Sequence, residues 1–148
     1  MTYSPILAPV VALAAWSLIM LVWLYAARFP AMRRAGISLK GRVGSRGQQL
    51  DGVIEDSAQW KSHNYAHLME QPTVFYAIAI TLALMDMGGG INLWLACGYV
   101  GLRVLHSLVQ ATINIVSVRL LLFTLATLCL IGMTTHAGLR VLHDCFGW

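Results

Sequence analysis

The sequence predicts an all-α integral membrane protein, built as a bundle of four transmembrane helices. The 148 residues are 58% hydrophobic and 11% charged, with a positive mean hydropathy, whereas an ordinary soluble domain carries about 25% charged residues. The apolar residues also fall into long runs, and a run of about 20 residues is enough to cross a bilayer. At this length we expect one domain, covering residues 1–148.

Four membrane spans follow from the positions of these runs. The first run ends at Arg28, Phe29 and Pro30, and the second ends at a glycine triplet, "GGG". The remaining apolar stretch, 91–142, would be about 78 Å long as one helix, so it must fold back, and we place its connection in the polar segment "NIVSVR". The expected spans are about 6–27, 63–87, 91–115 and 118–142.

Basic side chains gather in the loop 28–62, between the first two runs. They are Arg28, Arg33, Arg34, Lys40, Arg42, Arg46 and Lys61. Cytoplasmic loops carry such an excess of basic residues, so we expect this loop in the cytoplasm and both termini on the non-cytoplasmic side. Because the charges do not spread over a globular face, membrane lipids are the expected partner and nucleic acid is not.

Two stripes of polar residues are expected to face each other inside the bundle. On the second span, His63, His67 and Glu70 share one helix face through their i, i+4, i+7 spacing. The third span presents a second face, made of Arg103, His106, Gln110 and Asn114. An ionised carboxylate costs several kcal/mol in hydrocarbon, so we expect a cation at a similar depth to compensate Glu70.

Arg103, with His106 beside it, is predicted to supply that compensation, within one subunit or across an interface. Arg119, at the start of the fourth span, adds a cation near the cytoplasmic rim, where helix-terminal N–H groups also favour anions. Pro72 should free the carbonyl of Leu68 and kink the helix beside Glu70. Together these features favour a pocket for a charged ligand that opens toward the cytoplasm.

Two alternatives compete with this interpretation. The Arg103–Glu70 pair could serve only to hold the bundle together. A metal or haem site could form from His63, His67 and His106, although no cysteine or second carboxylate is placed to complete it. The three cysteines have neither metal-ligand spacing nor an even count, so they predict no zinc site and no disulfide framework.

Two motifs resemble those of a known family. "HNYAHLMEQPTVFY" and "RVLHSLVQATINIVSVRLLLF" are similar to segments of the membrane-associated proteins in eicosanoid and glutathione metabolism, the MAPEG family, especially its bacterial branch. The resemblance implies a homotrimer of four-helix bundles in a bacterial inner membrane, with glutathione as co-substrate bound at subunit interfaces near the cytoplasmic side.

The resemblance also implies roles for individual residues. Glu70 would hold the glutathione ammonium group, Arg103 a carboxylate, and Arg119 would stabilise the thiolate as the catalytic residue. The remaining substrate-binding candidates, from the two polar stripes and the motifs together, are His106, His67, Gln110, Asn114, His63 and Asn64. The chain departs from the family pattern at Ala66, His67, Phe123 and Gln110.

These expectations lead to two functional hypotheses. The first is a glutathione-dependent membrane transferase or peroxidase that acts on lipophilic electrophiles or lipid hydroperoxides arriving through the bilayer. The second is a non-catalytic trimeric membrane protein that binds a lipid or a partner, with the polar stripes serving only its assembly.

Overall fold

The computed structural model describes residues 3–41, 43–44 and 46–147, and these residues form helices and no strands. The prediction of an all-α fold is therefore confirmed. The α-helices are α1 (Leu7–Arg34), α2 (Asp56–Glu70), α3 (Pro72–Leu84), α4 (Gly90–Thr112) and α5 (Val116–Phe146), and a short 3-10 helix, η1, spans Gly47–Leu50. Arg42, one of the predicted loop cations, lies outside the described residues.

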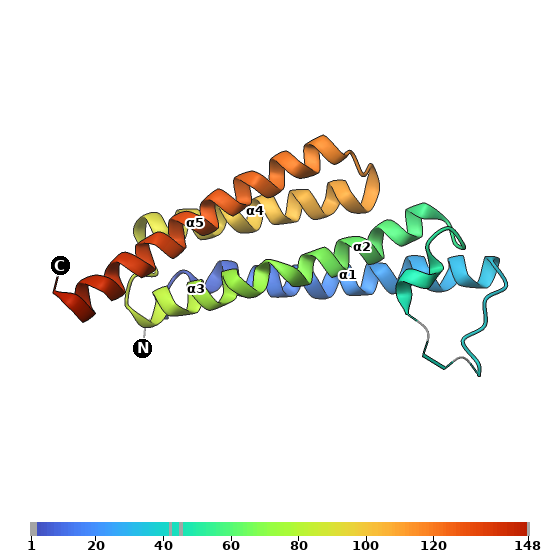
Figure 1. Cartoon of the computed structure of the whole chain (residues 1–148), viewed down its shortest axis with the longest axis horizontal. Helices are drawn as coiled ribbons and strands as arrows, with labels where there is room; N and C mark the ends of the chain where they lie inside the picture. The colour runs from blue at the N-terminus through green and yellow to red at the C-terminus, as the bar shows by residue number, and fades with distance from the viewer. Residues whose placement is uncertain (1–2, 42, 45, 148) are drawn as a thin grey trace.

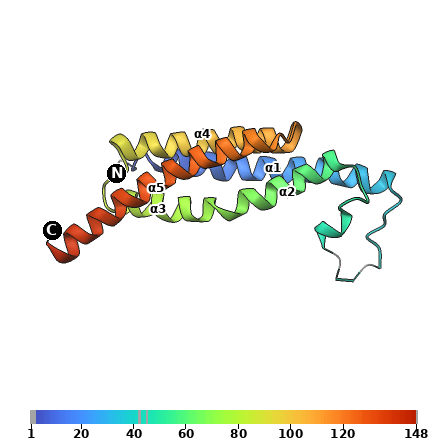
Figure 2. The same cartoon turned by 45° about the horizontal axis from the view of Figure 1, so that its top comes forward.

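The helices run side by side along one long axis, as Figures 1 and 2 show. The segment between α1 and α2 lies at one end of the bundle, and the first and last described residues lie at the other. The C-terminal end of α5 projects past the neighbouring helices.

Helices α2 and α3 form one rod with a break in its hydrogen-bond ladder at Gln71. Gln71 itself keeps helical angles (φ −65°, ψ −36°), but Pro72 has no N–H to donate to Leu68. The Thr73 hydroxyl donates to the Glu70 carbonyl at 2.7 Å, and the Val74 N–H turns to Gln71 at 3.0 Å. The irregularity expected beside Glu70 is therefore present, in the form of a local change of hydrogen-bond partners.

Two helix ends differ from the expected span limits. Helix α1 continues through Pro30 to Arg34, and α2 begins at Asp56, well before His63. Both extensions pack against the η1 segment in a small second core, made of Ala31, Met32, Leu50, Ile54 and Ala58. Burial of these apolar side chains explains why the helices extend into a region that composition alone assigns to a loop.

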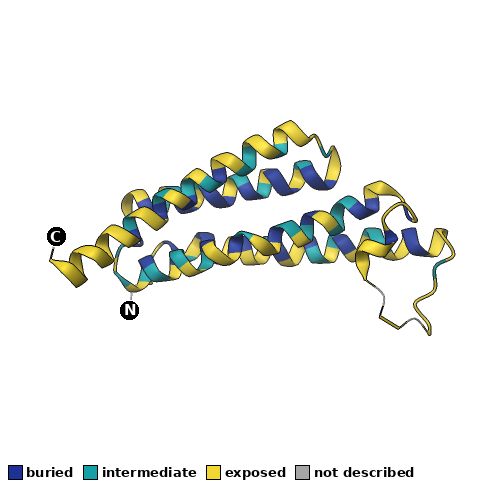
Figure 3. Cartoon of the chain, viewed as in Figure 1, coloured by how far each residue is buried: buried dark blue, intermediate teal, exposed yellow. Residues whose placement is uncertain are grey.

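The outer faces of the bundle remain strongly apolar. Figure 3 shows buried residues concentrated where the helices face each other and exposed residues along their outer sides. Many of the exposed residues are large and hydrophobic, among them Val11, Leu18, Val22, Trp94, Leu120, Leu128 and Leu139. A soluble monomer rarely exposes so much contiguous apolar surface.

Within the described part of the chain, length and composition single out two helices, α1 and α5, as able to cross a membrane. The second span is divided at Gln71 into the 15-residue α2 and the 13-residue α3, and the 23-residue α4 carries the polar stripe with Arg103. The connection between α4 and α5 lies earlier in the chain than the expected spans placed it, because α4 ends at Thr112 and α5 already begins at Val116.

Gly88 provides a test of how the N-terminal segment packs. A Cβ added at Gly88 would lie 1.9 Å from the Ser4 Oγ and 2.8 Å from the Ile6 Cγ2. We expect Gly88→Ala to lower the free energy of unfolding by about 1–3 kcal/mol, the usual cost of overpacking, as measured by thermal unfolding in detergent. The neighbouring Gly89→Ala is the control, since its Cβ would meet nothing within 4 Å, and equal losses in both variants would contradict the assignment.

Candidate functional site: a cationic pocket between α2, α4 and α5

A pocket of about 200 Å³ lies where α2, α4 and α5 meet. Its lining residues are His67, His106, Val116, Arg119, Leu120 and Phe123. His67, His106 and Phe123 bring their rings together, with His67 centred 5.1 Å from His106 and 5.2 Å from Phe123. Three helices far apart in the sequence therefore meet in one ring cluster.

Arg103 lies beneath this ring cluster and is the most deeply buried cation of the described chain. Only 1% of its surface is exposed. Its guanidinium lies 5.7 Å from the Phe123 ring centre, and its Nη2 donates to the His67 carbonyl at 2.9 Å. Its Nε and Nη1 have no hydrogen-bond partner among the described residues, so Arg103 retains donors for a ligand.

Arg119 lines the wall of the same pocket and is held by the α4–α5 turn. Its Nη1 donates to the Asn114 Oδ1 at 2.6 Å, while its buried Nε has no partner in the described part of the chain. Asn114 adopts a left-handed conformation (φ 51°) and its N–H bonds the Val109 carbonyl at 2.7 Å. Asparagine tolerates this conformation better than most residues, so the turn itself orients Arg119.

Glu70 lies at the edge of this region, on the surface of the single chain. Its side chain is 70% exposed and its Oε2 lies 3.1 Å from the His67 Nδ1. Within the described residues it forms no ion pair with an arginine. In the single chain the carboxylate of Glu70 thus contacts a histidine, and its pairing with Arg103 across an interface stays a prediction.

Three other predicted substrate-binding residues lie outside the pocket of the single chain. His63 turns to the loop, where its Nε2 lies 3.0 Å from the Asp51 Oδ1. Asn64 is buried and donates to the Ser107 Oγ at 2.7 Å, which joins α2 to α4. Gln110 is buried as well, and its Oε1 has no partner among the described residues.

A polar network that sequence reasoning missed lies below Arg103. The Tyr99 hydroxyl donates to the Gln71 Oε1 at 3.3 Å, and the Gln71 Nε2 donates to the Thr127 Oγ1 at 2.8 Å. These bonds tie the break in the α2–α3 rod to α4 and α5. The sequence could have indicated that Tyr99 belongs to this region, because it lies four residues before Arg103 on α4 and thus on the same face.

The other chemistry considered from the sequence has less support in the geometry. Among the described residues, no group of three His, Cys, Asp or Glu side chains could hold a metal ion.

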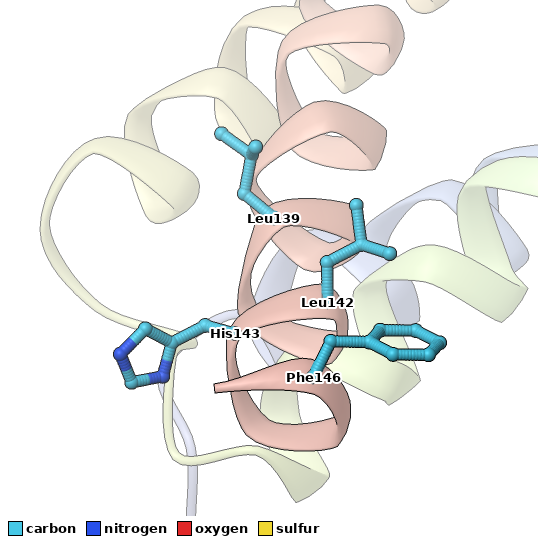
Figure 4. A pocket seen from close by; sticks show the side chains of 4 residues that line it. All are labelled: Leu139, Leu142, His143 and Phe146. Carbon is cyan, nitrogen blue, oxygen red and sulfur yellow. The ribbon is translucent and has the colours of Figure 1, made fainter. Parts of the chain in front are cut away.

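A further hollow of about 380 Å³ near the C-terminus is lined by Leu139, Leu142, His143 and Phe146. All four side chains come from α5 (Figure 4), and this hollow contains no cluster of polar groups.

The loop side of α2 holds a charged cluster around Asp51. The carboxylate accepts a hydrogen bond from Gln59 and contacts His63. The Gln59 bond is the main cause that lowers the pKa of Asp51 below its usual value of 3.8, and the His63 hydrogen bond lowers it further. A lowered carboxyl pKa contributes stability that is present above pH 3.8 and is lost as the pH falls through the folded-state pKa.

Gln59→Leu should therefore make the loop more sensitive to acid. Without the Gln59 donor, we expect the pKa of Asp51 to rise toward 3.8, so that the loop loses its resistance to limited proteolysis at a higher pH than in the wild type. Pepsin digestion at stepwise lower pH measures this. Gln48→Leu, at an exposed position of the same segment, is the matched control, and identical pH profiles for the two variants would refute the role of Gln59.

Fold and site together define an all-helical protein with exposed apolar faces and a pocket lined by Arg119, next to the buried Arg103. A protein-family model, that of the MAPEG family, matches residues 6–139 of the chain. The chain therefore belongs to the MAPEG family, as the two sequence motifs indicated. Comparison with curated proteins and with solved structures found no match.

Membership in this family has general consequences. It makes the chain a membrane-integral protein related to glutathione or eicosanoid metabolism. The exposed apolar faces of α1 and α5 agree with contact to lipid.

Proposed function

We propose that the protein binds glutathione in this pocket and either joins it through its sulfur to a lipophilic compound dissolved in the membrane or uses it to reduce such a compound. The observation that carries the proposal is Arg103, which is almost fully buried and yet has two guanidinium nitrogens without a partner in the described chain. A buried cation is costly unless it is compensated. A carboxylate of glutathione would compensate it with charge-assisted hydrogen bonds.

Arg119 is proposed to stabilise the thiolate. A thiol has an unperturbed pKa of about 8.5, and a guanidinium close to the sulfur favours the ionised form, which is the nucleophile. Arg119 lies in the pocket wall with its Nε unused and its orientation fixed by Asn114. The Phe123 ring and Leu120 supply an apolar wall for the second substrate.

Two reactions follow from a thiolate in this place. In a conjugation, the sulfur forms a bond to an electrophilic carbon and the leaving group departs with the bonding electrons. In a peroxidase reaction, two glutathione thiols reduce one lipid hydroperoxide to an alcohol and water, and become a disulfide. The apolar substrate would enter through the bilayer, and the pocket brings the two reactants into contact.

A homotrimer is part of this proposal. At about 200 Å³ the pocket of one chain is smaller than the roughly 300–1,000 Å³ of most ligand sites, and Glu70 lies exposed beside it. A neighbouring copy that covers this face would enlarge the site and bury Glu70, where the carboxylate could receive the glutathione ammonium group. We place the site toward the cytoplasm, in line with the basic loop at the end of the bundle opposite to the termini.

Glutathione binding is the direct test. We expect glutathione, and more strongly its sulfonate analogue, which resembles the thiolate, to raise the unfolding temperature of the detergent-solubilised protein. Glu70→Gln should weaken binding by about ten-fold or more, since a hydrogen bond to a charged group contributes about 1.5–3 kcal/mol. The matched control is Asp144→Asn, a carboxylate at the far end of α5.

Absence of glutathione binding would favour the second hypothesis, a non-catalytic membrane protein. If millimolar glutathione neither binds nor turns over, the protein is better described as a non-catalytic membrane protein. Mass spectrometry of the gently solubilised protein would then identify a co-purified lipid in place of the thiol, and the mass of the protein in native conditions gives the number of copies.

A further inference from the structure

The entire net charge of the chain is concentrated at the loop end of the bundle. Residues 28–62 contain seven basic and three acidic side chains, which account for the formal net charge of +4. The remaining three basic residues, Arg103, Arg119 and Arg140, are balanced by Glu70, Asp86 and Asp144. Any anionic surface is therefore attracted to one end of this protein.

A second pocket opens at this basic end, between the last turns of α1 and the η1 segment. It measures about 310 Å³, and its lining residues are Tyr25, Arg28, Phe29, Met32, Leu39, Arg46, Gly47 and Leu50. Most of this wall is apolar, and the Tyr25 and Phe29 rings are stacked with their centres 5.5 Å apart. The pocket therefore combines an apolar wall with two guanidinium groups.

Neutral groups fix the guanidinium of Arg28 in the wall. Its Nη2 donates to the Gly47 carbonyl at 2.7 Å and its Nη1 donates to the Ser62 Oγ at 3.3 Å. A Cβ at Gly47 would lie 2.6 Å from the Arg28 Nη2, so a side chain at this position would shift the guanidinium. The nearby carboxylate of Asp51 is bonded to Gln59 and His63, so the positive charge of Arg28 is oriented without a direct ion pair.

We propose that this pocket binds the headgroup of an anionic phospholipid from the adjacent leaflet. Arginine recognises phosphate through paired N–H donors, and the apolar wall fits the glycerol and upper acyl region of the same molecule. A small soluble anion would leave that wall in contact with water. Arg28 lies at the end of the first predicted span, which is the level of the headgroups.

A defined lipid site can be distinguished from a diffuse electrostatic attraction to the membrane. Basic residues near an anionic membrane each contribute about five-fold to its attraction, wherever they lie on the surface. A defined site instead requires that Arg46 contribute more to lipid binding than Arg33 does. Arg33 carries the same charge on the last turn of α1 but does not line the pocket. A defined site also requires that the apolar wall contribute, although it bears no charge.

Lipid retention in native mass spectrometry tests the proposal. The full-length protein is reconstituted in nanodiscs of phosphatidylcholine with a minor share of phosphatidylglycerol, released, and its bound lipids are counted. We expect preferential retention of phosphatidylglycerol, a loss of about ten-fold or more in Arg46→Gln, a smaller loss in Arg33→Gln, and no change in Arg140→Gln at the other end. Leu39→Asn should also reduce retention without changing the net charge.

Two results would overturn the proposal. Equal losses in Arg46→Gln and Arg33→Gln, with full retention in Leu39→Asn, would show diffuse electrostatics only. Displacement of the lipid by inorganic phosphate at the same concentration would show a site for a soluble anion. Thermal unfolding of each variant in lipid-free detergent checks its folding. If Arg46→Gln unfolds, it is replaced by Arg46→Lys, which keeps the charge but loses the paired donors.

Discussion

Arg119→Ala is expected to lower kcat for glutathione-dependent turnover by about a hundred-fold, while the affinity for glutathione changes much less. Removal of one group that stabilises developing negative charge typically costs 10²–10³ in kcat, and thiolate formation is the step that this guanidinium serves. Its partner Asn114 orients it at 2.6 Å. Steady-state kinetics with an aromatic electrophile and with a lipid hydroperoxide, together with a separate binding measurement, check both parts of the expectation.

Arg140→Ala is the matched control for this variant. It removes the same side chain from the same helix, but Arg140 lies near the C-terminus, where its Nε pairs with the Asp144 Oδ2 at 3.0 Å. Turnover should stay at the wild-type level. If Arg119→Ala and Arg140→Ala behave alike, Arg119 has no part in the chemistry, and the thiolate must be stabilised by another group.

Arg103→Met is expected to weaken glutathione binding strongly without loss of stability. Arg103 has one hydrogen bond in the described chain, to a carbonyl, and two unused donor nitrogens. An apolar side chain of similar length would remove the cost of a buried charge, so we expect the free energy of unfolding without ligand to stay the same or rise by about 1–4 kcal/mol. Loss of charge-assisted bonds should weaken glutathione binding by about 3 kcal/mol, or a hundred-fold.

This variant also separates a binding role from a structural one. If Arg103 holds the assembly together through an ion pair with Glu70 of another copy, Arg103→Met leaves that carboxylate unpaired and should destabilise the protein by about 3–5 kcal/mol. Thermal unfolding and native mass in the absence of glutathione distinguish the two outcomes. A destabilised, dissociated variant would therefore contradict the binding role.

The helical fold was predictable from the sequence because apolar runs of membrane length report helices directly. The residues at which the helices begin and end were less predictable. Pro30 was interpreted as a stop, yet α1 continues to Arg34, because burial of Ala31 and Met32 against the loop outweighs one missing hydrogen bond. Likewise, α2 begins at Asp56, since Ala58 is buried against the same loop residues. Such contacts are made by segments far apart in the sequence, so no local pattern reveals them.

The candidate site was predictable to the level of the helix face. The spacing on α4 placed Arg103 and His106 on one side, and the structure brings both to the ring cluster with His67. Spacing could not show the direction of each side chain, because another hydrogen-bond partner nearby can draw the side chain away from the pocket. Asp51 attracts His63 to the loop, and Ser107 engages Asn64 in the helix interface. Asp51 lies outside both motifs, and Ser107 lies within the second motif but is not one of the residues assigned to its polar stripe.

The bond from Arg103 to the carbonyl of His67 also bears on how the chain enters its membrane. An arginine near the centre of an inserting helix costs about 2.5–3.5 kcal/mol, and this cost would arise during synthesis if α4 crosses the membrane as the sequence predicts. Helix α2 is synthesised earlier, so the acceptor carbonyl would already be present when its donor arrives. The order of the two segments along the polypeptide would then let an otherwise unfavourable residue be inserted against a waiting partner, and a permuted chain with α4 ahead of α2 would lose that help during biogenesis.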